Sequence, residues 1–456
     1  MATQNTYVPI SYGCVAPRPS VLRRLIAGRR AFGLADQILI SGSNFITMVL
    51  VGRGLGIAGF GQFSLVYNIL LLANMIQASL VTQPHNVLGA GREPGGDYNG
   101  YTASTAVSQG IMAAAQALLA LAFVAVARVE GWHCAALLLA LAPAIAFWQL
   151  QEFFRRTLYT EGRMGAALLN DIVSYGGQAA WIAALWWSDR HVADPAQHRL
   201  TGPAAMYALA ITSAVAAAIG LFQVRASLRG RPNFADWIEN WHFGKWLLGS
   251  DLLTYFSSLP MYMNMVALMV GEAASGYLKA SQTLFGPTRV ISFYLATVLP
   301  IQFSRSLAAG GGLALQEQLK KTSRVVLPLL GLFCLAIGLF AAPLLTIFGR
   351  EFAAHPRVLA LYAVVAFLTY GQMILTAALT AKRRTRAIFF STLWGAGLTL
   401  LISWPLIKAI ALDGALVAMI LTGLAMTAMY WKGYRQSLEE DLSAQRTSAV
   451  PPRAAA

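Results

Sequence analysis

Apolar runs as long as a bilayer-spanning helix recur from one end of the chain to the other. They cover residues 33–52, 60–83, 101–127, 132–153, 164–187, 203–224, 245–270, 275–303, 325–348, 357–380, 387–407 and 412–431. A helix needs about 20 predominantly apolar residues to cross the hydrocarbon core of a membrane. Only 12% of the residues are charged, against about 25% in soluble domains. We therefore predict an all-α polytopic membrane protein with about 12 transmembrane helices and no sizeable soluble domain.

The basic residues fall mainly on one side of these predicted spans. An even number of spans puts both ends of the chain on the same side, which carries 25 Lys and Arg residues, whereas the opposite side carries eight. The positive-inside rule then places both termini in the cytoplasm. The net charge of +15 thus reflects membrane topology and attraction to anionic membrane lipids. We do not expect nucleic acid as a partner.

The longest predicted cytoplasmic connection separates two sets of six spans. The predicted organisation is a cytoplasmic tail (1–32), a six-helix lobe (33–224), a cytoplasmic linker (225–244), a second six-helix lobe (245–433) and a disordered cytoplasmic tail (434–456). Two matches in the same order relate the lobes. The spacing Gly56-x4-Gly61 recurs as Gly271-x4-Gly276, and the basic turn RRTLYTEGR (155–163) resembles AKRRTR (381–386). Repeated lobes in the same orientation are typical of alternating-access carriers, so we predict a V around a central cavity.

Polar side chains are concentrated in a few of the predicted spans. The first span presents a polar face that includes Asp36, Gln37 and Asn44, and a glycine-rich turn with Arg53 follows it. Such a face is tolerated in a bilayer only against protein or a wet cavity. Similar stripes occur in the second, third, fifth, seventh and eighth spans. The predicted cavity residues are Gln37, Asn44, Arg53, Asn74, Gln109, Tyr255, Gln282 and Arg289.

The charged residues within spans allow two interpretations each. Arg289 lies near the middle of the eighth span, beside a Gly286-Pro287 interruption. It either pairs with an acid that locks two helices together or waits for an anionic headgroup, since guanidinium binds phosphate in a bidentate way. Asp36, Asp171 and Asp251 lie near the cytoplasmic ends of their spans. They are either interhelical hydrogen-bond partners or candidates for ion coupling.

Several segments resemble one known family. DQILISGSNFITMVLVGRGLGIAGFGQFS (36–64) resembles the opening helix and turn of polysaccharide flippases of the multidrug/oligosaccharidyl-lipid/polysaccharide exporter (MOP) superfamily. QEFFRRTLYTEGRMGAALLNDIVSYG (151–176), FGKWLLGSDLL (243–253) and ISFYLATVLPIQFSRSLA (291–308) are similar to later segments of that family. Asp36, Asn44 and Arg53 match family-patterned positions, whereas Arg289 has no family motif behind it.

The resemblance implies a function as well as a fold. It implies a two-lobed, Wzx-like transporter of the bacterial inner membrane, with a central cationic cavity. Its cargo would be an undecaprenyl-diphosphate-linked oligosaccharide, flipped to the periplasmic leaflet for exopolysaccharide, capsule or O-antigen synthesis. The expected partners are that lipid-linked sugar, membrane lipids, and polysaccharide polymerase or export machinery.

Two other functions remain open from the sequence. An ion-coupled small-molecule exporter of the same superfamily would share the fold. A membrane polysaccharide polymerase or ligase is less favoured, because the longest far-side loop (188–203) is short and its Asp189, His191 and Asp194 are best interpreted as a solvated loop. The three cysteines lack metal-binding spacing, and no phosphate-binding G-x4-G-K-[S/T] motif is present. We therefore expect no catalytic residues, no metal and no cofactor.

Overall fold

The computed structural model describes residues 19–194 and 197–448, and every regular element in these ranges is helical. The helices are α1 (Pro19–Gln77), α2 (Gln83–Leu88), α3 (Gly96–Val129), α4 (Ala135–Thr160), α5 (Met164–Asp171), α6 (Gly177–Asp189), α7 (Gly202–Val224), α8 (Phe234–Phe256), α9 (Leu259–Met269), α10 (Glu272–Leu284), α11 (Arg289–Phe293), α12 (Leu299–Leu339), α13 (Ala341–Leu345), α14 (Pro356–Ala381) and α15 (Thr385–Ser448). Short 3-10 and π turns lie between them: η1 (Ala78–Thr82), η2 (Gly89–Gly91), η3 (Ile172–Gly176), η5 (Gly286–Thr288), η6 (Tyr294–Val298) and η7 (Arg350–Ala354).

Three of the helical stretches are long enough to cross a membrane twice. Ala35–Gly91 has 57 residues, Gly286–Leu339 has 54 and Thr385–Asp441 has 57, whereas one crossing needs about 20. Each folds back at a break in the helical backbone, at Gly56, at Gly310–Gly311 and at Ile410–Ala411. Together with α3, α4, α5–α6, α7, α8–α9 and α14, they supply the twelve membrane-length segments that the sequence predicts.

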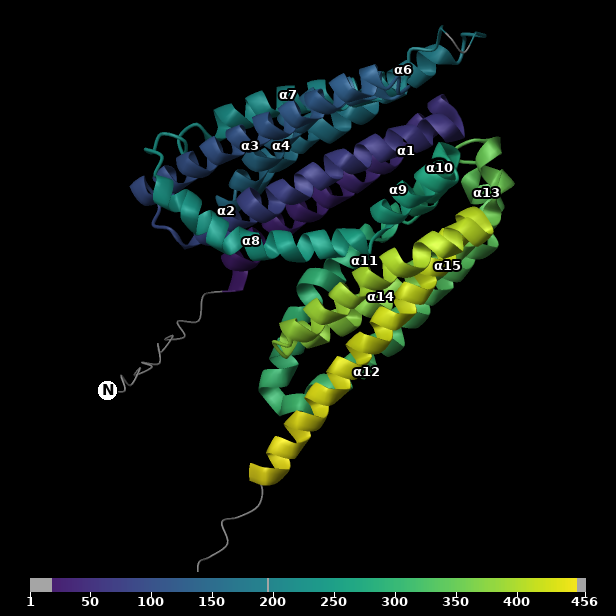
Figure 1. The fold of residues 1–456 in the computed structure, drawn as a ribbon. Coiled ribbons are helices and arrows are strands. Elements are labelled where there is room, and N and C mark those ends of the chain that lie inside the picture. The colour runs from purple at the N-terminus through teal and green to yellow at the C-terminus, as the bar shows by residue number, and fades with distance from the viewer. Residues whose placement is uncertain (1–18, 195–196, 449–456) are drawn as a thin grey trace, which may run out of the picture.

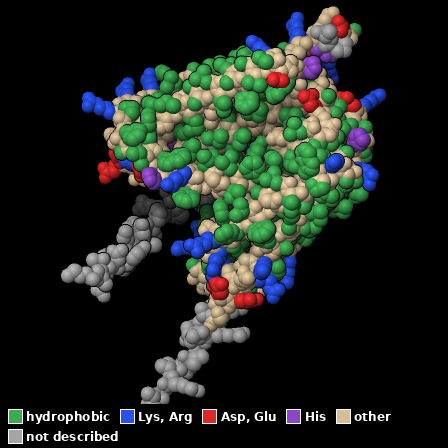
Figure 2. All heavy atoms as spheres, in the orientation of Figure 1, with side chains coloured by type: hydrophobic (Ala, Val, Ile, Leu, Met, Phe, Trp, Pro, Cys, Tyr) green, Lys and Arg blue, Asp and Glu red, His purple; other side chains and the backbone are tan. Residues whose placement is uncertain are grey.

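The segments form two lobes that diverge as a V (Figure 1). We call α1–α7 the first lobe and α9–α15 the second lobe. The lobes meet where α1 packs on α10, near α13, and they separate toward the side on which α15 ends. Hydrophobic side chains cover the visible flanks of both lobes, and Lys and Arg gather at their ends (Figure 2). This distribution is that of a multi-pass membrane protein.

A reciprocal glycine contact closes the V. A Cβ atom on Gly61 would lie 1.9 Å from the carbonyl oxygen of Glu272, and a Cβ atom on Gly276 would lie 2.3 Å from that of Ile57. Positions 57 and 61 correspond to 272 and 276 in the register that pairs Gly56 with Gly271. Gly56 and Gly271 both have positive φ angles, of 67° and 123°. The two lobes therefore meet through equivalent surfaces, as a two-fold repeat requires.

The second sequence match also has a structural counterpart. The backbone N–H groups of residues 161, 162 and 163 donate to the carbonyls of 157, 159 and 158. Those of residues 382, 383 and 384 donate to the carbonyls of 378, 380 and 379, which is the same pattern. Gly162 and Arg383 occupy equivalent positions with φ angles of 72° and 57°. The two basic turns thus share one helix-terminating conformation.

Helix α8 packs against the first lobe, although the sequence assigns it to the linker and the second lobe. Its Asn240 accepts a 2.5 Å hydrogen bond from Tyr101 of α3, and its Asp236 accepts one of 2.7 Å from Ser104. Farther along, Asp251 accepts a 2.6 Å bond from Ser79 of η1. The chain then bends by 46° between α8 and α9. The break at Ser257–Ser258 is therefore the point at which the polypeptide leaves the first lobe.

The predicted tail boundaries also change. The sequence predicts disorder from residue 434, but α15 remains helical to Ser448. The helix continues because Tyr434 and Leu438 are buried and Asp441 forms a 2.7 Å ion pair with Lys382. At the other end, α1 begins at Pro19. The remaining tail residues, 1–18 and 449–456, lie outside the described residues.

Candidate functional site

Two basic side chains, Lys279 and Arg289, lie close together where the lobes face each other. Lys279 of α10 is only 6% exposed; its Nζ donates to Gln282 Oε1 at 3.0 Å and lies 5.4 Å from the ring centroid of Tyr67 in α1. Arg289 is exposed, and its charge acts on both Lys279 and Tyr67. Among the described residues, neither cation has a carboxylate within ion-pair distance.

The local sequence explains why Arg289 begins a new helix. Gly286-Pro287 interrupts the span as the sequence predicts, because η5 separates α10 from α11 there. Proline cannot continue the α-helical hydrogen bonding, so Arg289 begins a new helix. The sequence allows Arg289 either to pair with an acid or to await an anion, and no acid among the described residues forms an ion pair with it. Its charge also acts on Glu152 of the first lobe, but Glu152 already pairs with Arg155 and Arg156.

A second polar cluster is buried inside the first lobe, where α1, α4 and α5 meet. Arg155 of α4 lies 3.3 Å from the carboxylate of Glu152 and 3.5 Å from that of Asp171. Tyr159 donates its hydroxyl hydrogen to Asp36 of α1. Asp36 and Asp171 are both buried, and the Arg155 guanidinium that faces Asp171 lies 5.3 Å from the centroid of the Tyr159 ring. The two acids therefore belong to one connected buried cluster.

The neighbouring helices fix the position of Asp171. Gln151 donates to Asp171 at 3.1 Å and to Asn170 at 2.9 Å, and Asn170 donates to the Ala216 carbonyl of α7 at 2.6 Å. The π turn η3 follows Asp171 directly, and such turns are frequent at functional sites. We call Asp36, Glu152, Arg155, Tyr159 and Asp171 the first-lobe charge cluster.

Arg53 lies at the closed end of the V. Its Nε donates to the carbonyl oxygen of Ile347 in the second lobe at 2.7 Å. Beside it, the ring of Phe60 lies 5.8 Å from that of Phe348 and 5.9 Å from that of Phe352. Arg53 therefore joins the two lobes in this conformation, and its predicted contact with substrate stays a prediction.

The other predicted cavity residues are spread over the first lobe and α8. Gln109 is fully buried, with its Nε2 3.3 Å from Gln149 Oε1. Gln37 donates to Ser41 of its own helix at 3.2 Å. Asn44 and Asn74 are half-buried, and Asn74 Oδ1 has no partner among the described residues. Tyr255 accepts a 3.2 Å bond from Asn264. Of the predicted residues, Gln282 accepts a hydrogen bond from Lys279, and the charge of Arg289 acts on Lys279.

The far-side loop is organised around one acid that the sequence treats as solvated. Asp189 is 8% exposed and accepts hydrogen bonds from the backbone N–H groups of Arg199 (2.9 Å) and Leu200 (2.7 Å). Burial opposes its charge, but these two N–H groups, together with the charge of His198 and a hydrogen bond from Ser188, lower the pKa of Asp189. His191 is exposed, as expected. No group of three His, Cys, Asp or Glu side chains in the described ranges converges as a metal site requires.

Sequence reasoning missed four important side chains: Glu152, Arg155, Tyr159 and Lys279. The sequence predicts a basic turn over residues 155–163, whereas α4 continues to Thr160. Glu152, Arg155 and Tyr159 are then spaced i, i+3 and i+7 on one helix face. Extending the helical periodicity into the basic segment would have found this face.

Several solved structures share this arrangement of helices. An inward-facing MATE family multidrug resistance transporter of the MOP superfamily matches with a TM-score of 0.71 and 13% identity, covering 91% of this chain and 96% of that chain. The lipid II flippase MurJ, in an inward closed conformation, matches with a TM-score of 0.65 and 12% identity over 93% of both chains. The chain has the fold of MOP superfamily transporters. An outward-facing MATE structure of this fold matches less well, with a TM-score of 0.58, 13% identity and coverage of 89% and 96%. No family model and no curated protein matches the sequence.

Proposed function

We propose that the protein flips an undecaprenyl-diphosphate-linked oligosaccharide from the cytoplasmic to the periplasmic leaflet of the bacterial inner membrane by alternating access. One observation carries the proposal: Lys279 and Arg289 lie together between the lobes, without a carboxylate partner among the described residues. Two like charges held in a membrane protein are costly unless an anion or water accompanies them. A diphosphate supplies two negative groups of the right size and geometry for a guanidinium and an ammonium.

The remaining features fit the same cycle. The diphosphate and sugars would travel between the lobes while the isoprenoid chain stays in lipid. The MOP fold includes a lipid II flippase among its solved examples, and the flippase-like segments found in the sequence cover residues on both lobes. With both termini in the cytoplasm, the V opens to the leaflet in which the cargo is made. Delivery to a polysaccharide polymerase or export machinery would follow.

We assign ion coupling to the first-lobe charge cluster. Asp36 and Asp171 share a buried site with Arg155, so gain or loss of one proton there changes the charge balance of the lobe. Asp251 instead ties α8 to η1 through Ser79. Proton coupling of this kind also suits the alternative function, an ion-coupled small-molecule exporter, whose support is the MATE resemblance of the fold.

The test reconstitutes the full chain in liposomes with a fluorescent undecaprenyl-diphosphate oligosaccharide and measures its movement between leaflets. Loss of a charge-assisted hydrogen bond costs about 1.5–3 kcal/mol, so we expect Arg289→Ala and Lys279→Met each to slow movement roughly 10- to 100-fold. Arg289→Lys should retain more activity than Arg289→Ala. Arg324→Ala, which removes an exposed cation from α12, is the matched control and should match wild type.

Two results would contradict the proposal. Movement of the lipid-linked sugar at the wild-type rate in both cation variants would show that Lys279 and Arg289 do not bind the diphosphate. No movement of the lipid-linked sugar by wild type, combined with gradient-driven efflux of a small cationic dye, would favour the exporter. In the same liposomes, an imposed proton gradient should increase the rate at which wild type moves the lipid-linked sugar. The rate of the Asp171→Asn variant should not change with the gradient.

A further inference from the structure

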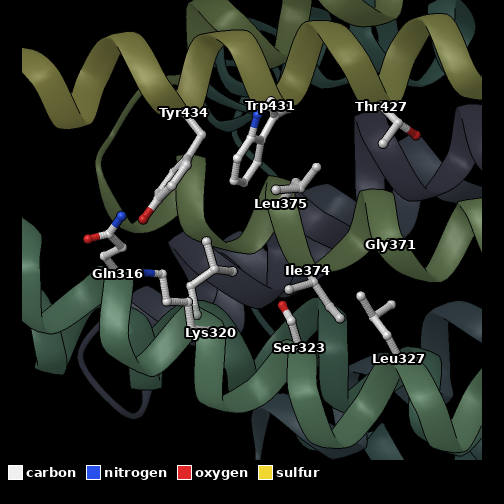
Figure 3. A pocket seen from close by; sticks show the side chains of 11 residues that line it. Gln316, Lys320, Ser323, Leu327, Gly371, Ile374, Leu375, Thr427, Trp431 and Tyr434 are labelled. Carbon is white, nitrogen blue, oxygen red and sulfur yellow. The ribbon is translucent and has the colours of Figure 1, made fainter.

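A pocket of about 340 Å³ lies inside the second lobe, between α12, α14 and α15. None of its lining residues belongs to α10 or α11, the helices that carry Lys279 and Arg289. α14 packs against both α12 and α15, which leaves these two helices splayed on either side of it. Figure 3 shows side chains from all three helices turned toward the space between them.

The pocket has a polar end and an apolar end. Gln316 and Lys320 of α12 lie near Tyr434 of α15 at one end (Figure 3). Leu375 and Ile374 follow beside Trp431, and Leu327 lies at the other end, where Thr427 is the polar side chain. The polar end is nearer the Gly310–Gly311 break and the end of α15, so it faces the side toward which the V opens. The apolar end runs inward along the helices. A membrane lipid is arranged in the same way, with its polar headgroup at the bilayer surface and its apolar acyl chains deeper in the bilayer.

Two polar groups at this end lack protein partners. Tyr434 is 1% exposed, and its hydroxyl has no hydrogen-bond partner among the described residues. A buried hydroxyl without a partner costs roughly 1–3 kcal/mol, so a ligand atom that bonds to it is favoured. Lys320 is exposed, and no acid in the described part of the chain lies within ion-pair distance of it. Trp431, at the pocket rim, is 48% exposed, as is typical of aromatic residues at the membrane interface.

The surrounding charges favour an anion. Lys321 and Arg324 are exposed on α12, and Lys432 and Arg435 are exposed on α15. Of the nearby acids, Asp441 pairs with Lys382 at 2.7 Å, Glu440 pairs with Arg384 and Glu439 lies 3.9 Å from Arg435. Glu317 of α12 is the one exposed acid here without an ion pair among the described residues, and it is outnumbered by Lys320, Lys321, Arg324 and Lys432. Basic clusters beside a membrane helix attract anionic lipids, at about 1 kcal/mol per residue.

We propose that this pocket binds one anionic phospholipid of the adjacent leaflet. The phosphate contacts Lys320 and the Tyr434 hydroxyl, and one acyl chain lies along Leu327, Ile374 and Leu375. A methylene group is about the size of a water molecule, which occupies about 30 Å³, so the pocket holds about ten such groups. That volume fits a section of one chain. The bound lipid fills the gap between α12 and α15 and so fixes the spacing of the second lobe.

The experiment uses the full-length protein, reconstituted with equal amounts of phosphatidylglycerol and phosphatidylethanolamine and then examined by native mass spectrometry. We expect wild type to retain phosphatidylglycerol at least fivefold over phosphatidylethanolamine. Lys320→Gln should reduce retention at least fivefold. Gly371→Leu should do the same by filling the pocket, since a Cβ atom at Gly371 meets nothing within 4 Å.

Two matched controls come from the same lobe. Lys408→Gln removes an exposed cation that does not line the pocket and lies beside the Ile410–Ala411 break, and Gly397→Leu adds the same side chain where the space is also open. Both should retain phosphatidylglycerol as wild type does. Equal retention by all variants, or equal retention of the two lipids by wild type, would overturn the proposal. Displacement of phosphatidylglycerol by equimolar undecaprenyl phosphate would also overturn it, because the pocket would then belong to the transport substrate.

Discussion

At the scale of single residues, the two neighbouring arginines of α4 have different environments. Arg155 is buried between Glu152 and Asp171, whereas the side chain of Arg156 is 41% exposed and lies 2.8 Å from the same Glu152. Removing one partner of a buried ion pair typically costs about 3–5 kcal/mol, because the other charge stays buried. An exposed pair contributes about 0–1 kcal/mol.

Arg155→Met is therefore expected to destabilise the first lobe strongly, and Arg156→Met to have little effect. Thermal unfolding of the two variants in the same detergent measures the difference. Both substitutions remove one arginine that contacts Glu152, so Arg156→Met controls for the loss of positive charge. Similar unfolding midpoints for the two variants would show that Arg155 is not the centre of the charge cluster.

Some charged residues of the site can be predicted from the sequence, and the others cannot, for a physical reason. It finds Asp36, Asp171 and Arg289, because an ionised residue inside an apolar run stands out against its neighbours. It does not find Arg155 or Lys279, because both lie near the ends of spans, where basic residues are common for topological reasons. The link from Asp36 to Asp171 runs through Tyr159 and Arg155 and joins residues far apart in the chain, and no local pattern predicts which polar faces meet.

At the scale of elements, α8 is the helix whose place the sequence does not predict. The Gly-Pro break, the glycine turns and the membrane-length runs follow from local chemistry, and all of them appear in the structure. The assignment of α8 to a lobe depends instead on polar pairs such as Tyr101–Asn240 and Ser79–Asp251. Gly244 allows this docking, since a Cβ atom there would lie 2.5 Å from the Ser79 carbonyl oxygen.

Gly244→Val should therefore detach α8 from the first lobe. Hydrogen–deuterium exchange across residues 234–256 measures the loss, and we expect protection to fall about tenfold, equivalent to about 1.4 kcal/mol. Gly249→Val is the matched control in the same helix, because a Cβ atom at Gly249 meets nothing within 4 Å. It carries the same cost in helix propensity. Equal protection in the two variants would mean that the glycine contact does not hold α8.

At the scale of the whole molecule, the reciprocal contact of Gly61 and Gly276 keeps one end of the V closed. Arg53 and the three rings of Phe60, Phe348 and Phe352 cross the same boundary. An alternating-access cycle must break all of these contacts at once, since the lobes meet here as two packed surfaces.

A single side chain at Gly61 should shift this equilibrium. Overpacking costs about 1–3 kcal/mol, which changes a two-state ratio roughly 5- to 150-fold, so Gly61→Val favours molecules whose closed end has opened. If the lobes rock as rigid bodies, the opposite end then narrows. Spin labels at Val87 and Leu313, both exposed, measure the distance between the lobes at the opposite end by double electron–electron resonance. We expect a population with a shorter label-to-label distance in the variant. Gly110→Val, on an open face of α3, should keep the wild-type distribution. An unchanged distribution in Gly61→Val would show that the lobes separate at this contact without closing elsewhere, and rigid-body rocking would have to be abandoned.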